Sequence, residues 1–158
     1  MSNVNDELAE LLAEMKAYGE ANHVPIININ GLAVLEKAVA ARKPRRVLEI
    51  GTAIGYSTLY IAANAASEVE IVSLELSEER AAEARAFVDR SPYGQQIRII
   101  TGDAGENIQK LTGSFDRCRQ GTVSGLFSQN ISFVNRGCFG GGRQCSVSWL
   151  CPWRRASS

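Results

Sequence analysis

Residues 49–57, Glu-Ile-Gly-Thr-Ala-Ile-Gly-Tyr-Ser, combine small and polar side chains at a spacing suited to binding a ligand. Small residues at positions 51, 53 and 55 let the backbone turn tightly from a strand into a helix and let a ligand touch the main chain. The first N–H groups of that helix attract an anion by ~0.3–1 kcal/mol. This pattern predicts a binding loop that consists of Glu49, Gly51, Thr52, Ala53, Gly55 and Ser57.

The spacing within this loop separates two classes of cofactor. The order is G-x-A-x-G, with Tyr56 at the position where a dinucleotide fingerprint has its third glycine. That fingerprint also has no acid at the position of Glu49. Both features favour S-adenosylmethionine over NAD, and an NAD-dependent oxidoreductase remains as an alternative.

Two further sites are expected at the same edge of the predicted sheet. Glu75 follows Gly51 by 24 residues and ends an apolar run, where its carboxylate can accept two ribose hydroxyls. Hydrogen bonds to charged groups contribute roughly 1.5–3 kcal/mol each. Asp103 and Ala104 follow the next apolar run; Asp103 is either a ligand contact or a plain turn residue.

Alternating strands and helices position these residues. Short apolar runs predict buried parallel strands, and the segments between them predict helices, the second capped by Ser77. This order indicates an α/β fold with a Rossmann-like, doubly wound sheet. The strands are expected at 46–50, 70–75 and 97–100 and the helices at 57–66 and 78–90.

Two helices are expected before the first strand. Leu8, Leu11, Leu12 and Met15 recur at helical spacing, so residues 6–20 form an amphipathic helix whose stripe packs on a partner element or a second subunit. A homodimer through this helix is therefore one interpretation. The next helix is predicted to start with Asn30 as its cap and to end before Pro44.

The chain resembles the class I, cation-dependent O-methyltransferases, the family of caffeoyl-CoA and catechol O-methyltransferases and their small bacterial relatives. The resemblance covers about residues 20–116. It rests on the strings HVPI at 23–26, VLEIGTAIGYS at 47–57, the acid of SLELS at position 75 and ITGDA at 100–104.

The resemblance implies methyl transfer from S-adenosylmethionine to the hydroxyl of a small acceptor, assisted by a divalent cation. It implies that Asp103 sits beside the adenine and that His23 lies near the substrate mouth. We leave His23 out of the predicted site, because a loop histidine is more often not catalytic. The residues implied to contact S-adenosylmethionine are Glu49, Gly51, Thr52, Ser57, Glu75 and Ala104.

Composition changes abruptly after residue 116. Residues 1–116 contain all 17 acidic residues and only 11 of the 17 Lys and Arg. Residues 117–158 contain no acid, all four Cys and both Trp. We therefore expect two parts: 1–116, the N-terminal part of a methyltransferase domain, and 117–158, a poorly ordered tail without the family's later strands.

A frameshift is our explanation for this change. Read one base later, codons permitted for Asp116 to Val123, completed by the first base of a Ser124 codon, translate as IDAAKGQY, and those for Arg143 to Cys151 translate as DNVLFRGY. Strings of this type supply the metal ligands and a lysine in the resembled family, and neither is present in the chain as written. The sequence therefore predicts an inactive chain with no catalytic or metal-ligating residues. It also predicts an exposed first-strand edge, partly covered by Leu126-Phe127 and by Ile131 to Phe133.

Charge and hydropathy narrow the remaining function classes. The acidic first part lacks the clustered basic residues of a nucleic-acid interface, and no apolar run approaches the ~18 residues of a membrane helix. We expect a soluble, cytoplasmic protein. A non-catalytic binding or dimerisation module and, less favoured because no C-x-x-C pair occurs, a metal-binding cysteine tail remain as alternatives.

Overall fold

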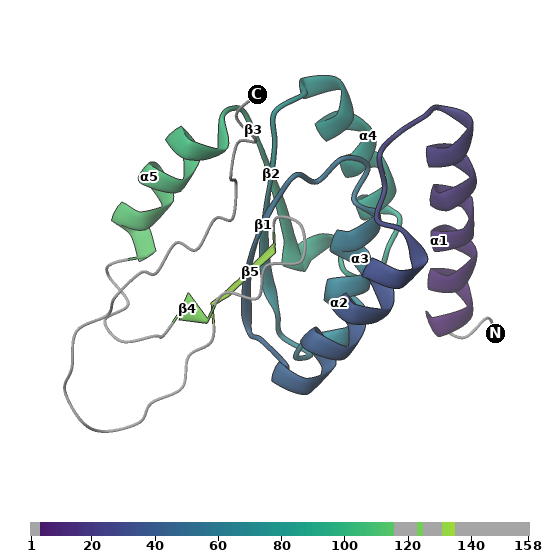
Figure 1. Cartoon of the computed structure of the whole chain (residues 1–158), viewed down its shortest axis with the longest axis horizontal. Helices are drawn as coiled ribbons and strands as arrows, with labels where there is room; N and C mark the ends of the chain where they lie inside the picture. Colours follow the sequence, from purple (N-terminus) through teal and green to yellow (C-terminus); the bar gives the residue numbers. More distant parts are fainter. Residues whose placement is uncertain (1–3, 116–122, 125–130, 135–158) are drawn as a thin grey trace, which may run out of the picture.

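A computed structural model describes residues 4–115, 123–124 and 131–134 of the chain. Its centre is a sheet in the order β3-β2-β1-β5-β4 (Figure 1). Strands β1 (Arg46–Ile50), β2 (Glu70–Glu75) and β3 (Ile97–Thr101) are parallel, and α3 (Tyr56–Asn64) and α4 (Glu78–Asp89) connect them. The predicted α/β class is confirmed, with strand bounds within one residue of those expected.

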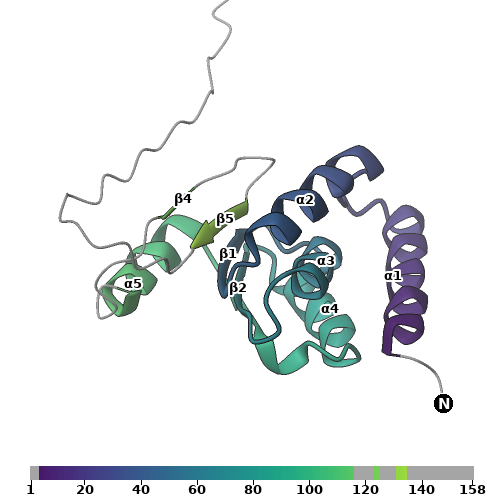
Figure 2. The same cartoon turned by 90° about the horizontal axis from the view of Figure 1, so that it is seen from below.

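Helices cover both faces of the sheet, which confirms the doubly wound arrangement. Helices α2 (Ile29–Arg42), α3 and α4 lie on one face and α5 (Ala104–Phe115) lies on the other (Figure 2). Because successive strand residues face opposite sides, Val47 and Ile71 join the larger apolar cluster under α2–α4. Val72 and Leu74 pack instead with Leu111 of α5.

The N-terminal helix α1 (Val4–Ala21) packs inside the chain. Its stripe, Leu8, Leu11, Leu12 and Met15, is at most 9% exposed and belongs to the larger cluster. Tyr18 donates its hydroxyl to Glu83 of α4 at 2.7 Å and packs edge-on against Phe87. The stripe thus faces partner elements of the same chain, and a second subunit is not needed to bury it.

The cap of α2 differs from the expected one. Asn28, and not Asn30, is the N-cap: its backbone is extended and its side chain accepts the Gly31 N–H at 2.9 Å. The helix begins at Ile29, so Asn30 lies in its first turn. Both residues are good caps by type, and the sequence alone did not decide between them.

The free edge of β1 also differs from expectation. Strand β5 (Ile131–Val134) pairs antiparallel with β1, from Arg46 opposite Val134 to Glu49 opposite Ile131, and β4 (Val123–Ser124) pairs with β5. Ile131 to Phe133 were expected to cover part of this edge, and the backbone pairing agrees. Leu126 and Phe127, also expected there, lie outside the described residues. Beyond the three parallel strands, the described residues add only these two short antiparallel strands to the sheet. Within the described residues, no helix combines the length and the apolar character needed to cross a membrane.

Candidate functional site

The loop from β1 to α3 is the tight turn that its small residues predict. Three of its residues have positive φ: Gly51 at 92°, Ala53 at 49° and Gly55 at 85°. The backbone N–H groups of Gly51 and Thr52 both donate to the Leu74 carbonyl of β2, at 2.8 and 3.2 Å. The turn therefore sits directly over the carboxyl ends of two neighbouring parallel strands, the edge at which such sheets bind ligands.

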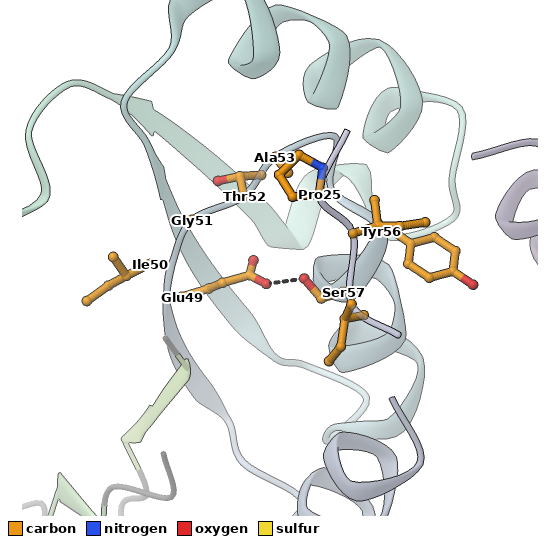
Figure 3. A pocket seen from close by; sticks show the side chains of 10 residues that line it. Pro25, Glu49, Ile50, Gly51, Thr52, Ala53, Tyr56 and Ser57 are labelled. Atoms are coloured by element: carbon orange, nitrogen blue, oxygen red, sulfur yellow. Dashed lines mark hydrogen bonds between the residues drawn. The ribbon is translucent and has the colours of Figure 1, made fainter. Parts of the chain in front are cut away.

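Glu49 is a buried carboxylate at the base of this loop. Its side chain points from β1 toward the start of α3, where Ser57 meets it (Figure 3). The residue is 1% exposed, and Oε1 accepts the Ser57 hydroxyl at 2.6 Å. Oε2 accepts the hydroxyls of Thr58 at 2.5 Å and Ser73 at 2.6 Å.

Every partner that the structure gives Glu49 is uncharged. Among the residues described, no Lys, Arg or His forms an ion pair with it. Burial raises the pKa of this carboxyl, while the three hydroxyl bonds act in the opposite direction and the charge of Glu75 adds to the rise. A buried charge of this kind is costly without a partner of opposite sign.

Glu75 holds the loop from the neighbouring strand. It is 8% exposed, and its carboxylate accepts the backbone N–H of Ala53 at 2.8 Å and that of Ser77 at 3.0 Å. A carboxylate has about four acceptor positions, so two remain for hydroxyl donors of a ligand. The predicted position at the strand end is confirmed, whereas the predicted ribose contact stays a prediction.

A pocket of about 190 Å³ opens beside Glu49 (Figure 3). Its polar wall comes from the predicted loop, and its apolar wall comes from the connection between α1 and α2, together with Tyr56. Five predicted site residues are brought together here. The lining consists of Pro25, Ile26, Ile27, Glu49, Ile50, Gly51, Thr52, Ala53, Tyr56 and Ser57.

The remaining predicted residues lie outside this lining. Gly55 completes the loop, Glu75 reaches it through Ala53, and Asp103 and Ala104 stand at the end of β3. Asp103 Oδ1 accepts the Glu106 N–H at 3.0 Å and so caps α5. His23 is exposed in the turn after α1, with φ of 54°.

Sequence reasoning missed several residues of the site. Pro25 and Ile26 belong to the HVPI string but were not assigned to a pocket wall. Ser73 was missed although it precedes Glu75 by two positions, so both face the same side of the sheet as Glu49. That alternation was the available signal.

No metal centre is evident in the part of the chain that the structure describes. Within it, no three His, Cys, Asp or Glu side chains gather closely enough to hold an ion. The four cysteines lie outside the described residues, so the metal-binding tail stays a prediction.

Comparison with known proteins identifies the family to which this site belongs. The sequence profile described as O-methyltransferase matches residues 2–120. The chain belongs to the O-methyltransferase family. This confirms the predicted resemblance.

Individual relatives match part of the chain. A catechol O-methyltransferase from Mycobacterium tuberculosis is 32% identical over 107 residues, which cover 65% of this chain and 47% of that protein. A tRNA1(Val) (adenine(37)-N6)-methyltransferase from Pasteurella multocida is 32% identical over 71 residues, covering 45% of this chain and 30% of the relative.

A solved structure shows the same arrangement. An O-methyltransferase from Bacillus cereus in complex with SAH superposes with a TM-score of 0.61 at 29% identity, covering 66% of this chain and 48% of that one. This chain spans about half the length of the curated relatives it matches.

Proposed function

We propose that this chain binds S-adenosylmethionine, with the amino-acid end of the cofactor in the pocket beside Glu49. One observation carries the proposal: a carboxylate that is 1% exposed lines a pocket and has only hydroxyl partners among the described residues. Buried charges are normally paired. An ammonium group of a ligand supplies the missing positive charge.

The rest of the predicted site fits the remainder of this cofactor. The pocket, at about 190 Å³, is smaller than the ~300–1,000 Å³ typical of a whole ligand site. It therefore suits the amino-acid end, while the nucleoside extends along the carboxyl edge of the sheet. Glu75 would accept the ribose hydroxyls, and Asp103 and Ala104 would lie beside the adenine.

The family relationship supports methyl transfer to oxygen as the ancestral reaction. The cofactor supplies an electrophilic methyl group, and the protein contributes mainly the positioning of two reactants. Proteins named for a catechol and for a tRNA base are both similar to parts of this chain, so similarity alone does not define the acceptor. We infer a small hydroxyl compound as the acceptor of the intact enzyme.

We infer further that the chain as written does not catalyse this reaction. Strings like the family's metal ligands and lysine are absent from the chain as written, codons permitted for the tail are compatible with them in a shifted reading frame, and the family profile ends at residue 120. The divalent cation of the family would then have no ligands here. Sequencing the coding DNA for residues 114–151 tests the frameshift: an open shifted frame through IDAAKGQY and DNVLFRG supports it, and codons that spell neither string overturn it. Metal-dependent turnover of a catechol-type acceptor by the chain as written would overturn the inferred inactivity.

Two alternatives receive less support. A dinucleotide would place a pyrophosphate near the buried carboxylate of Glu49, where like charges repel. The reason to consider a dimerisation module was the apolar stripe of α1, and that stripe is buried within the chain. A dimer through another surface and a cytoplasmic location remain predictions.

Calorimetric titration with S-adenosylhomocysteine tests the binding proposal. We expect the chain to bind this compound in preference to NADH. Glu49→Gln keeps the shape of the side chain but removes its charge, so it should weaken binding at least tenfold, since hydrogen bonds to charged groups contribute roughly 1.5–3 kcal/mol. The exposed Glu10 of α1 gives the matched control, Glu10→Gln. Equal affinity of Glu49→Gln and the control for S-adenosylhomocysteine would contradict the proposal.

A further inference from the structure

Two buried hydroxyl groups bind one oxygen of the Glu49 carboxylate, and a third buried hydroxyl binds one of these two. Ser73 lies directly opposite Glu49 in the β1–β2 register and donates to Oε2 at 2.6 Å. Thr58 of α3 donates to the same oxygen at 2.5 Å. Thr52 Oγ1 lies 2.6 Å from Ser73 Oγ. Thr58 and Ser73 are 0% exposed and Thr52 is 1% exposed.

The direction of the Thr52–Ser73 hydrogen bond follows from the number of protons. A hydroxyl has one proton to donate, and Ser73 gives its proton to Glu49. Thr52 must therefore donate to Ser73. The result is a relay, Thr52 to Ser73 to Glu49, which runs from the binding loop through β2 to β1.

The two carboxylate oxygens of Glu49 thus have different surroundings. Oε2 receives two donors that are buried completely, Thr58 and Ser73. Oε1 receives the hydroxyl of Ser57, which is only half-buried and lines the pocket (Figure 3). One oxygen is fixed in the interior, and the other lies on the ligand side.

We propose that Ser73, supported by Thr52 and Thr58, is a positioning residue that holds Glu49 Oε2 in the interior and so presents Oε1 to a cationic group of the ligand. This rests on the proposed binding of S-adenosylmethionine. None of the three hydroxyls needs to touch the ligand for this role, although Thr52 also lines the pocket.

The relay also sets the charge of Glu49. Burial and the nearby Glu75, the charged group that faces Glu49 among the described residues, favour the neutral acid, whereas the hydroxyl donors favour the carboxylate. Removing one donor must therefore raise the pKa of Glu49 further. A neutral Glu49 offers no charge to an ammonium group, so ligand affinity should then become more dependent on pH.

A purely structural role for the hydroxyls is the competing interpretation. It predicts that their loss lowers stability but leaves the pH dependence of binding unchanged. The discriminating variant is Ser73→Ala, with Ser73→Thr as the conservative variant that keeps the hydroxyl. Ser91→Ala is the matched control. Ser91 follows α4, away from the site, and its hydroxyl donates to the Val88 carbonyl within that helix. Thr58→Val, which removes the second Oε2 donor, is the second variant if Ser73→Ala does not fold.

The experiment combines two measurements on the full chain. The first is the titration of the Glu49 carboxyl, followed by its 13C chemical shift in the free protein. The second is the S-adenosylhomocysteine affinity between about pH 5 and 8. We expect Ser73→Ala to shift the Glu49 titration to higher pH and to weaken binding about tenfold at neutral pH. This is the lower end of the effect seen when a residue that supports a metal ligand by a hydrogen bond is removed, and Ser73 supports Glu49 in a comparable way. Ser73→Thr should restore both.

The outcomes separate this proposal from the proposed function. If Ser73→Ala leaves the Glu49 titration unchanged, or changes binding no more than Ser91→Ala does, the positioning role is wrong. If the titration shifts as expected but the wild-type chain does not bind S-adenosylhomocysteine, the relay stands and the proposed function fails.

Discussion

The carboxylate of Glu75 accepts the backbone N–H of Ala53 at 2.8 Å and thereby joins the end of β2 to the loop that follows β1. Its second oxygen accepts the N–H of Ser77 at 3.0 Å, at the start of α4. One side chain therefore holds two loops at the edge of the sheet where the cofactor is proposed to bind.

Replacing Glu75 by alanine should destabilise this edge. Both N–H groups lose a charged acceptor, so we expect Glu75→Ala to lower the free energy of unfolding by about 2 kcal/mol, measured by urea denaturation. The exposed Glu68 supplies a control variant, Glu68→Ala, with a much smaller effect. The proposed ribose contact requires weaker S-adenosylhomocysteine binding as well; lower stability with unchanged affinity would show that Glu75 is structural only.

The conformation of Gly55 makes a second prediction. Its φ is 85°, and a Cβ atom there would lie 3.3 Å from Val88 Cγ2. An L-residue in this region of φ costs about 1–2 kcal/mol, so Gly55→Ala should lower the midpoint of urea denaturation accordingly. In helical Gly19 of α1, where the nearest atoms to a new Cβ belong to the Ile26 side chain, also at 3.3 Å, and φ is not positive, the same change should cost less than at Gly55. Equal effects at both positions would show that the backbone conformation of Gly55 is not the cause.

The strands were predictable because their signal is local. Val47 to Ile50 form an apolar run that ends at a glycine, and β1 occupies the predicted residues 46–50. The burial of Glu49 followed from its place within that run. The antiparallel β5 was not predictable as a strand, because its pairing with β1 joins residues more than 80 positions apart and depends on which edge the rest of the fold leaves available.

Other residues of the site could not be predicted from the sequence, because their role depends on the register of the strands. Ser73 interrupts an apolar strand in the sequence, and only its position opposite Glu49 makes it a hydrogen-bond donor to that carboxylate. The pocket wall at Pro25 to Ile27 likewise required the packing of α1 and α2 against α3. Local patterns therefore identified the ligand loop, while its supporting groups emerged only from the tertiary structure.

The core position of Met15 predicts that α1 shapes the pocket. Met15 is 0% exposed, and a Met→Ala change in a core costs about 2–5 kcal/mol. Because α1 leads into the Ile26 wall, Met15→Ala should also speed amide hydrogen exchange at residues 24–28, measured by mass spectrometry. Lys16→Ala, at a side chain that is 57% exposed, serves as the control. If the Met15→Ala variant is less stable but its amide hydrogen exchange at residues 24–28 is unchanged, α1 does not shape the pocket.

The buried carboxyl of Glu49 predicts a stability that depends on pH. Burial raises its pKa above the usual value of 4.5, despite the opposing bonds from Ser57, Ser73 and Thr58. An acid with a higher pKa in the folded state binds more protons when folded, so its contribution to the free energy of unfolding falls as pH rises from about 4.5 toward the folded-state value. Each pH unit between the two pKa values corresponds to about 1.4 kcal/mol.

Glu49→Gln isolates this contribution, because it removes the titrating group and leaves the other acids in place. We expect the wild-type chain to lose stability relative to Glu49→Gln as pH rises through this window, in urea denaturation at matched pH values. Binding of S-adenosylhomocysteine by the wild-type chain should strengthen over the same range, since the ionised carboxylate is the form that attracts an ammonium group. Parallel stability curves for the two proteins would mean that Glu49 has the same pKa folded and unfolded. Opposite trends in stability and affinity would show that the charge at Glu49 opposes folding and favours the ligand.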